Sequence, residues 1–271
     1  MMRENRSMRL LRSAHIGPTI VVTAITFLLA HTLWPLWQSV LIATSIFLGQ
    51  LCVGWTNDLV DADVDGLQNR KGKPLAQGLI EKNTVVIATY FALAACVLLS
   101  IFGPLGVKGG MVHLLGVGCG VSYNFYFKRS LLSPLPYIVA FAALPTSIAL
   151  SKGELAPAWT VLVGGAFGLT AHFANVLKDM ERDQQAKIFG LPQRLGTRAS
   201  QLVTGSCLAF IAFLIPISFS RGWIVAIALI ACIAILRLPK KYSFAIIMLL
   251  ALIDVALLVT SDASLLITKG I

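Results

Sequence analysis

Two segments of the chain carry acidic residues at the spacing of helix turns. The first places Asn57, Asp61 and Asp65 four positions apart, and the second repeats this spacing with Asn175, Asp179 and Asp183. On a helix, residues four apart share one face, and like charges at this spacing repel one another. Such a face favours a bound cation, and hard divalent ions such as Mg²⁺ prefer oxygen ligands. The spacing therefore predicts a divalent-cation site.

Basic residues lie close to both acidic segments. Arg70 and Lys73 follow the first, Lys178 lies within the second, Arg194 follows it, and Lys128 and Arg129 end another apolar run. Mg²⁺ usually takes one or two carboxylates and completes its shell with waters and substrate phosphates, while basic side chains bind phosphate oxygens. This mixture predicts a metal–diphosphate site. The alternative is that these residues are solvated loop charges near a membrane surface.

The two acidic segments resemble each other along their whole length. With a constant offset of 118 residues, 57–78 aligns without gaps to 175–196 and shares seven identities in 22 positions. Ordinary composition would give roughly one or two. The offset spans four predicted helices, so both copies face the same side. We expect one membrane-embedded domain over 1–271, built from two four-helix units in parallel orientation plus a ninth helix, with the site between the halves.

The composition is that of a polytopic membrane protein. Of the 271 residues 57% are hydrophobic and 13% charged, and the mean hydropathy is +0.81. Apolar runs of this kind span a bilayer as helices. We predict an all-α bundle with nine transmembrane spans, at about 17–34, 37–55, 84–103, 107–127, 132–150, 157–177, 199–220, 222–237 and 242–262.

The placement of the basic residues predicts the orientation. With a cytoplasmic N-terminus, 18 of the 22 Lys and Arg residues fall in cytoplasmic segments, as the positive-inside rule requires. The C-terminus then lies outside, and the two acidic segments face the cytoplasm. Much of the net charge of +10 is thereby explained by topology and contact with membrane lipids, and no nucleic-acid partner is expected. The 18 residues are Arg3, Arg6, Arg9, Arg12, Arg70, Lys71, Lys73, Lys82, Lys128, Arg129, Lys178, Arg182, Lys187, Arg194, Arg198, Arg237, Lys240 and Lys241.

With these features in place, the chain resembles the UbiA-type intramembrane prenyltransferases, of which 4-hydroxybenzoate polyprenyltransferase is typical. NDLVDADVD fits their NDxxDxxxD motif, and KDMERD supplies their second DxxxD motif. The resemblance implies Mg²⁺-dependent transfer of an isoprenyl group from its diphosphate to a small acceptor, usually an aromatic quinone precursor. Relatives often carry a Tyr where this chain has Asn124, and an acid where it has Val176.

The resemblance also implies roles for individual residues. Asn57, Asp58, Asp61 and Asp65 would bind one Mg²⁺ with the diphosphate, and Asp179 with Asp183 the other. The catalytic residues would be Asp61, Asp65, Asp179, Asp183, Lys128 and Tyr123. The substrate would contact Asn57, Arg70, Lys73, Arg129, Asn175, Lys178, Arg194 and His15.

Several alternatives stay open at this stage. The same diphosphate site could serve terpenoid cyclisation, or phosphoribosyl transfer to a lipid phosphate. A repeat-built transporter is a further possibility, although transporters place ions near the bilayer midplane. His172 could touch substrate or be structural, and Asp254 could bind an acceptor or form a buried hydrogen bond.

Overall fold

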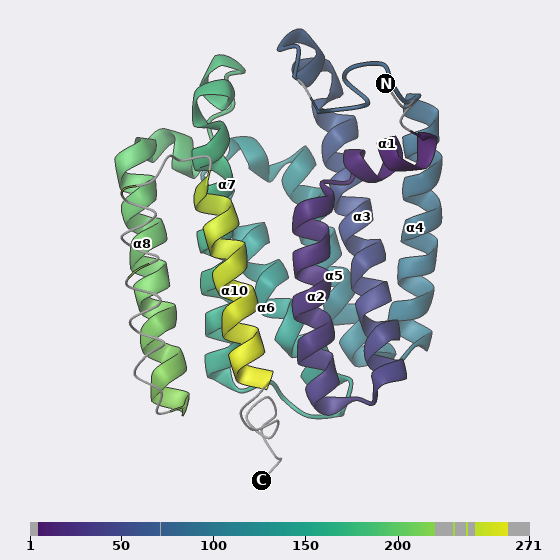
Figure 1. Ribbon diagram of the computed structural model, residues 1–271, viewed down its shortest axis with the longest axis vertical. Helices are drawn as coiled ribbons and strands as arrows, with labels where there is room; N and C mark the ends of the chain where they lie inside the picture. Colours follow the sequence, from purple (N-terminus) through teal and green to yellow (C-terminus); the bar gives the residue numbers. More distant parts are fainter. Residues whose placement is uncertain (1–4, 71, 220–229, 231–236, 238–241, 260–271) are drawn as a thin grey trace.

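The computed structural model describes residues 5–70, 72–219, 230, 237 and 242–259, and shows an all-α bundle (Figure 1). A short 3₁₀ turn covers Phe127–Arg129. The helices are α1 (Arg6–Ser13), α2 (Ile16–Leu33), α3 (Leu36–Leu67), α4 (Lys82–Phe102), α5 (Gly106–Phe125), α6 (Leu135–Leu150), α7 (Ala158–Gln185), α8 (Leu191–Phe219) and α10 (Ser243–Val259).

The helices agree with the predicted spans wherever the structure describes the chain. Eight predicted spans coincide with α2 to α8 and α10, which confirms the all-α class. The predicted eighth span, 222–237, lies almost wholly outside the described residues, as does the C-terminus at 260–271. Within the described part, α2, α3, α4 and α7 are long and apolar enough to cross a membrane on their own.

The two acidic motifs lie on helices that are longer than a membrane span. α3 has 32 residues, which at 1.5 Å per residue gives about 48 Å, against a hydrocarbon core of about 30 Å. The last turns of α3 and α7 carry the motifs and lie at one end of the bundle, which we call the motif end (Figure 1). The prediction that both motifs are helical and face one side is therefore met.

α3 and α7 end in the same way at positions 118 residues apart. Asn69 and Lys187 follow the two helices with left-handed φ values of 48° and 55°. The next backbone N–H then donates to a carbonyl five residues upstream, at 3.0 Å after α3 and 2.8 Å after α7. This C-terminal motif reverses the chain direction. After α3 the reversal returns Arg70 to the helix end beside the carboxylates.

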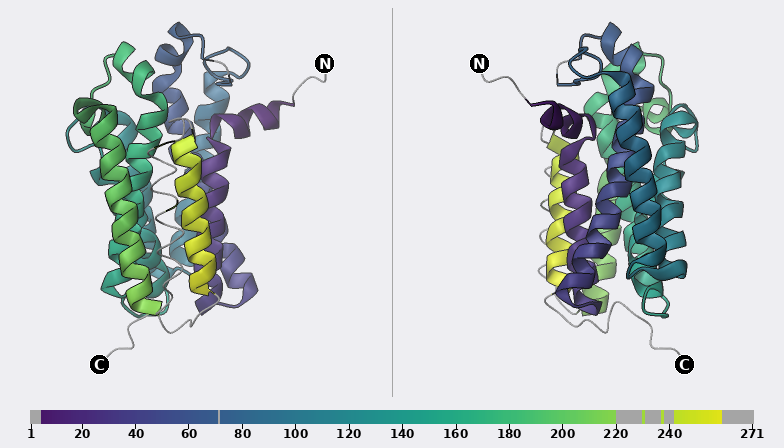
Figure 2. Two further views of the ribbon diagram at one scale, coloured as in Figure 1. Left: turned by 60° about the vertical axis from the view of Figure 1, so that its left-hand side comes forward. Right: turned by 90° about the vertical axis from the view of Figure 1, so that its right-hand side faces the viewer.

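A tight corner between α1 and α2 brings the N-terminal segment to the motif end. α1 lies across the bundle (Figure 2), and His15 joins it to α2 with φ 54°. Trp55 on α3 donates its indole N–H to the Leu10 carbonyl at 2.8 Å. Gly54 is required beneath this corner, since a Cβ there would overlap the backbone of Ala14.

We predict that Gly54→Ala destabilises the protein by about 1–3 kcal/mol, the usual cost of overpacking a filled contact. Thermal unfolding in detergent measures the change. Gly118→Ala is the matched control, because Gly118 is helical and has open space where its Cβ would be. Equal melting temperatures for the two variants would contradict the packing described at the α1–α2 corner.

Candidate active site

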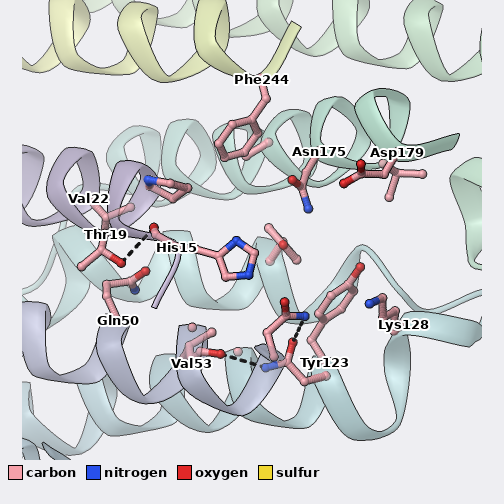
Figure 3. Close-up of a pocket in the computed structure, with 18 of the residues that line it drawn as sticks. His15, Thr19, Val22, Gln50, Val53, Tyr123, Lys128, Asn175, Asp179 and Phe244 are labelled. Atoms are coloured by element: carbon pink, nitrogen blue, oxygen red, sulfur yellow. Dashed lines mark hydrogen bonds between the residues drawn. The ribbon is translucent and has the colours of Figure 1, made fainter. Parts of the chain in front are cut away.

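A cavity of about 380 Å³ lies between the helices and reaches the motif end, where residues of both acidic motifs line it (Figure 3). α2, α3, α5, α6, α7 and α10 all contribute to its wall. Most of the candidate residues predicted from the sequence line this one cavity: His15, Asn57, Asp61, Arg70, Lys73, Tyr123, Lys128, Asn175, Lys178, Asp179 and Asp183. Residues more than 100 positions apart in the chain thus converge on a common space.

Arg70 joins the two acidic motifs directly. Its guanidinium donates to Asp65 on α3 and to Asp179 on α7, each at 3.1 Å. The planar fork of arginine can bind two carboxylates at once, which a lysine ammonium cannot match in geometry. Asp179 also accepts from Arg182 at 3.2 Å. The two motifs are therefore held together by one shared cation.

Lys73 lies in the cavity wall and forms a charged cluster with buried partners. Lys73 is only 7% exposed. Its ammonium donates to Asp58 at 2.7 Å and lies 3.7 Å from Asp65. It also lies 2.7 Å from Nε2 of His15. An ammonium only donates, so Nε2 accepts and the ring proton resides on Nδ1.

The imidazole of His15 is neutral. Burial lowers its pKa to about 3, and the positive charges of Lys73, Lys178 and Arg70 add to this effect, while a hydrogen bond with Asn57 opposes it. The side chain therefore contributes a hydrogen-bonding ring to the cavity and no charge at physiological pH.

Lys128 pairs with the central acid of the first motif. Its ammonium donates to Asp61 at 2.6 Å, and the Asn57 amide donates to the same carboxylate oxygen at 3.1 Å. Asn124, which stands where relatives often have Tyr, donates to the Val53 carbonyl at 3.0 Å and accepts from Asn57 at 3.3 Å. In this chain Asn124 thus orients Asn57.

The second motif is held by amides and a nearby base. Gln193 donates to Asp183 at 2.7 Å, and Lys178 donates to Asn175 at 3.2 Å. Gln193 lies at the start of α8, so the loop after α7 folds back over its own motif.

Four predicted site residues do not line the cavity. Asp58 and Asp65 are buried and lie behind Lys73 and Arg70, at 1% and 4% exposure. Arg129 is exposed, and Arg194 is held by the Phe189 carbonyl at 3.0 Å.

The sequence left the roles of His172 and Asp254 open, and the structure describes the side chain of His172 alone. His172 is fully buried, bonds Ser133 at 3.1 Å and does not line the cavity. The side chain of Asp254 lies outside the part of the chain that is described.

Sequence reasoning missed Gln50 and Tyr137, both of which line the cavity. Gln50 could have been found, because it precedes Asn57 by seven residues and so lies on the same helical face. Tyr137 gives no such signal, since its position in the wall depends on how α6 packs against α5.

The carboxylates fit Mg²⁺ bound together with a phosphate-bearing substrate. Oδ2 of Asp58 and Oδ2 of Asp65 are buried without a hydrogen-bond partner. No group of three or more His, Cys, Asp or Glu side chains in the described residues could hold a metal ion by itself. Mg²⁺ does not need such a group, because it usually takes one or two carboxylates plus waters and phosphates.

Removing the Arg70 guanidinium should weaken the contact between the two acidic motifs. We predict that Arg70→Ala lowers the free energy of unfolding by about 1–3 kcal/mol. This is less than the cost of breaking a fully buried pair, since the Arg70 side chain is 23% exposed. Arg194→Ala, at an exposed guanidinium, should change it by less than about 0.5 kcal/mol. Chemical unfolding in detergent would measure the free energy of unfolding of both variants. Equal changes would show that the Arg70 bridge does not contribute to stability.

Comparisons with known proteins identify a family for the chain. The UbiA prenyltransferase family matches residues 19–260. No curated protein sequence matches the chain.

Solved structures share the fold at low sequence identity. A UbiA homolog from Archaeoglobus fulgidus bound to GPP and Mg²⁺ has a TM-score of 0.71 and 17% identity, over 93% of this chain and 99% of that one. The apo UbiA homolog from Aeropyrum pernix K1 has a TM-score of 0.67 and 13% identity, over 94% and 98%. A digeranylgeranylglyceryl phosphate synthase has a TM-score of 0.63 and 16% identity, over 94% and 96%.

The family match covers most of the chain, and the acidic motifs, their basic partners and the helical bundle agree with it. This multi-pass membrane protein is therefore an enzyme of the UbiA prenyltransferase family.

Proposed function

We propose that the protein transfers an isoprenyl group from an isoprenoid diphosphate to a small lipophilic acceptor, with Mg²⁺ as cofactor. The observation that carries this proposal is the convergence of two acidic motifs and four basic side chains at one end of a cavity whose remaining wall is mainly apolar. The structure of the Archaeoglobus homolog with GPP and Mg²⁺ supports the same choice of donor.

The charged end of the cavity would hold the diphosphate. We assign Mg²⁺ binding to Asp58, Asp61, Asp65, Asp179 and Asp183. Arg70, Lys73, Lys128 and Lys178 would bind diphosphate oxygens. Arg70, Lys128 and Lys178 pair with acids that line the cavity, and Lys73 pairs with the buried Asp58. Bound Mg²⁺ would neutralise the charge that develops on the leaving diphosphate. Fixed charges aimed at that position lower the barrier because they need no reorganisation.

Aromatic side chains would surround the reacting carbon. Tyr123 and Tyr137 pack edge to face with ring centroids 5.0 Å apart, and both line the cavity, as Lys128 does. An allylic carbon gains positive charge as its bond to the diphosphate breaks, and aromatic faces stabilise such charge. The apolar wall deeper in the cavity excludes water, which would otherwise capture the cation.

The motif end is proposed to face the cytoplasm, because 18 of the 22 basic residues then lie on the cytoplasmic side. A water-soluble diphosphate head would enter there, and its isoprenyl chain would extend into the bundle. The position of the charges at one end of the helices argues against a transporter, since transporters bind ions near the midplane.

Release of diphosphate tests the reaction. The purified protein would be incubated with geranyl or farnesyl diphosphate, with Mg²⁺ or EDTA, and with or without an aromatic acceptor. We expect release that depends on both Mg²⁺ and acceptor, and a loss of at least about a hundredfold in Asp61→Ala, Asp179→Ala.

The matched control is Asp63→Ala, Glu181→Ala, which removes two exposed acids that also lie 118 positions apart. Its rate should stay close to that of the wild type. Mg²⁺-dependent release without acceptor would indicate cyclisation or hydrolysis instead. A folded protein that releases no diphosphate from either isoprenyl donor would contradict the proposal, and sugar diphosphates would then be tested as donors.

Variants at Tyr123 separate the ring from the hydroxyl. If the aromatic face stabilises positive charge, Tyr123→Phe should keep kcat within about threefold of the wild type. Tyr123→Leu should lower kcat by about thirtyfold, which corresponds to a desolvated cation–π contact of about 2 kcal/mol. Single-turnover product formation measures both. An equal loss in the two variants would instead assign the role to the phenol hydroxyl.

A further inference from the structure

The cavity contains a polar side chain for which the proposed donor site has no use. Gln50 lines the wall from α3, on the same helical face as Asn57 and Asp61 and about 10 Å along the helix from Asn57. Figure 3 places Gln50 beside Thr19 and Val22, at the end of the cavity away from Lys128 and Asp179.

The side-chain amide of Gln50 has no hydrogen bond to any described residue, and it lies in a membrane-spanning helix. The proton of the neighbouring Thr19 hydroxyl is already used, because the hydroxyl donates to the carbonyls of Ala14 and His15 at 3.1 and 3.3 Å. An amide covered only by an isoprenyl chain would lose water and gain no partner, which is unfavourable. The position favours a bound group that can itself hydrogen-bond.

Positive charge is confined to the other end of the cavity. Every Lys and Arg among its described lining residues, namely Arg70, Lys73, Lys128 and Lys178, lies within 4 Å of a motif carboxylate. His15 lies between the two ends (Figure 3) and is neutral, because its Nε2 accepts a hydrogen bond from the Lys73 ammonium at 2.7 Å. A carboxylate placed beside Gln50 would therefore be buried without a counter-ion, at high cost.

We propose that Gln50 recognises the acceptor, and that the acceptor presents to it an uncharged hydroxyl or carbonyl group rather than a carboxylate. This inference rests on the proposed function, since it assumes that the charged end holds the donor. It narrows the acceptor to neutral phenols, hydroquinones and alcohols, and makes Gln50 the residue that determines this specificity.

A matched pair of acceptors tests the charge. 4-Hydroxybenzoate and its methyl ester share the phenol ring and differ in the carboxylate. With Mg²⁺ and geranyl diphosphate, we expect the wild type to use the ester with a kcat/KM at least tenfold higher. The same comparison would be made with 1,4-dihydroxy-2-naphthoate and 1,4-dihydroxynaphthalene. Preference for the charged member of both pairs would overturn the inference.

Variants of Gln50 test the residue. Gln50→Leu should raise the KM for the ester about tenfold, and Gln50→Arg should shift the preference toward the acid. Gln38→Leu is the control, because Gln38 is on the same helix but outside the cavity. An unchanged KM in Gln50→Leu would show that Gln50 does not contact the acceptor, whether or not Gln50→Arg folds.

Binding of geranyl thiodiphosphate with Mg²⁺, followed by calorimetry, keeps the two proposals distinguishable. Wild-type protein that binds this donor analogue but transfers to none of the four acceptors overturns the acceptor assignment and leaves the donor site intact. Wild-type protein that fails to bind the analogue overturns the proposed function itself.

Discussion

The guanidinium of Arg70, held at 3.1 Å from both Asp65 and Asp179, is the contact on which the rest of the site depends. α3 and α7 end in carboxylate-bearing turns at the same end of the bundle, and two such faces repel each other without a cation between them. The reversal of the chain at Asn69 returns Arg70 to that gap. A local backbone feature thus supplies the charge that lets two distant segments share one site.

The fold divides the cavity into two chemically different ends. Acids and bases are concentrated at the motif end, on the last turns of α3 and α7 and beside them. Deeper in the bundle the wall is built mainly from apolar and small side chains, and Thr19 and Gln50 are polar exceptions among those described. A diphosphate ester with an isoprenyl chain has the same division along its length, so the distribution of polarity matches the proposed donor except at Gln50, which is assigned to the acceptor.

Close packing makes this division possible. Gly54 lets the backbone at Ala14 approach α3, and the corner beside it brings the neutral ring of His15 between the charged and apolar ends. Lys73 is then enclosed with Asp58, in a pair whose members are 7% and 1% exposed. Buried charges are tolerated only when paired, and Lys73 meets this condition through Asp58 at 2.7 Å, beside the His15 ring at the α1–α2 corner.

The sequence by itself determined the helices, the two acidic faces and their resemblance to the UbiA family, because hydropathy and four-residue spacing are local properties of the chain. Only the tertiary structure decided which base meets which acid, that Asn124 orients Asn57, that Arg129 and Arg194 lie outside the cavity, and that Tyr137 lies in its wall. These outcomes depend on contacts between helices far apart in sequence. Such contacts are set by packing and by the need to pair buried charges, and no spacing along one segment encodes them.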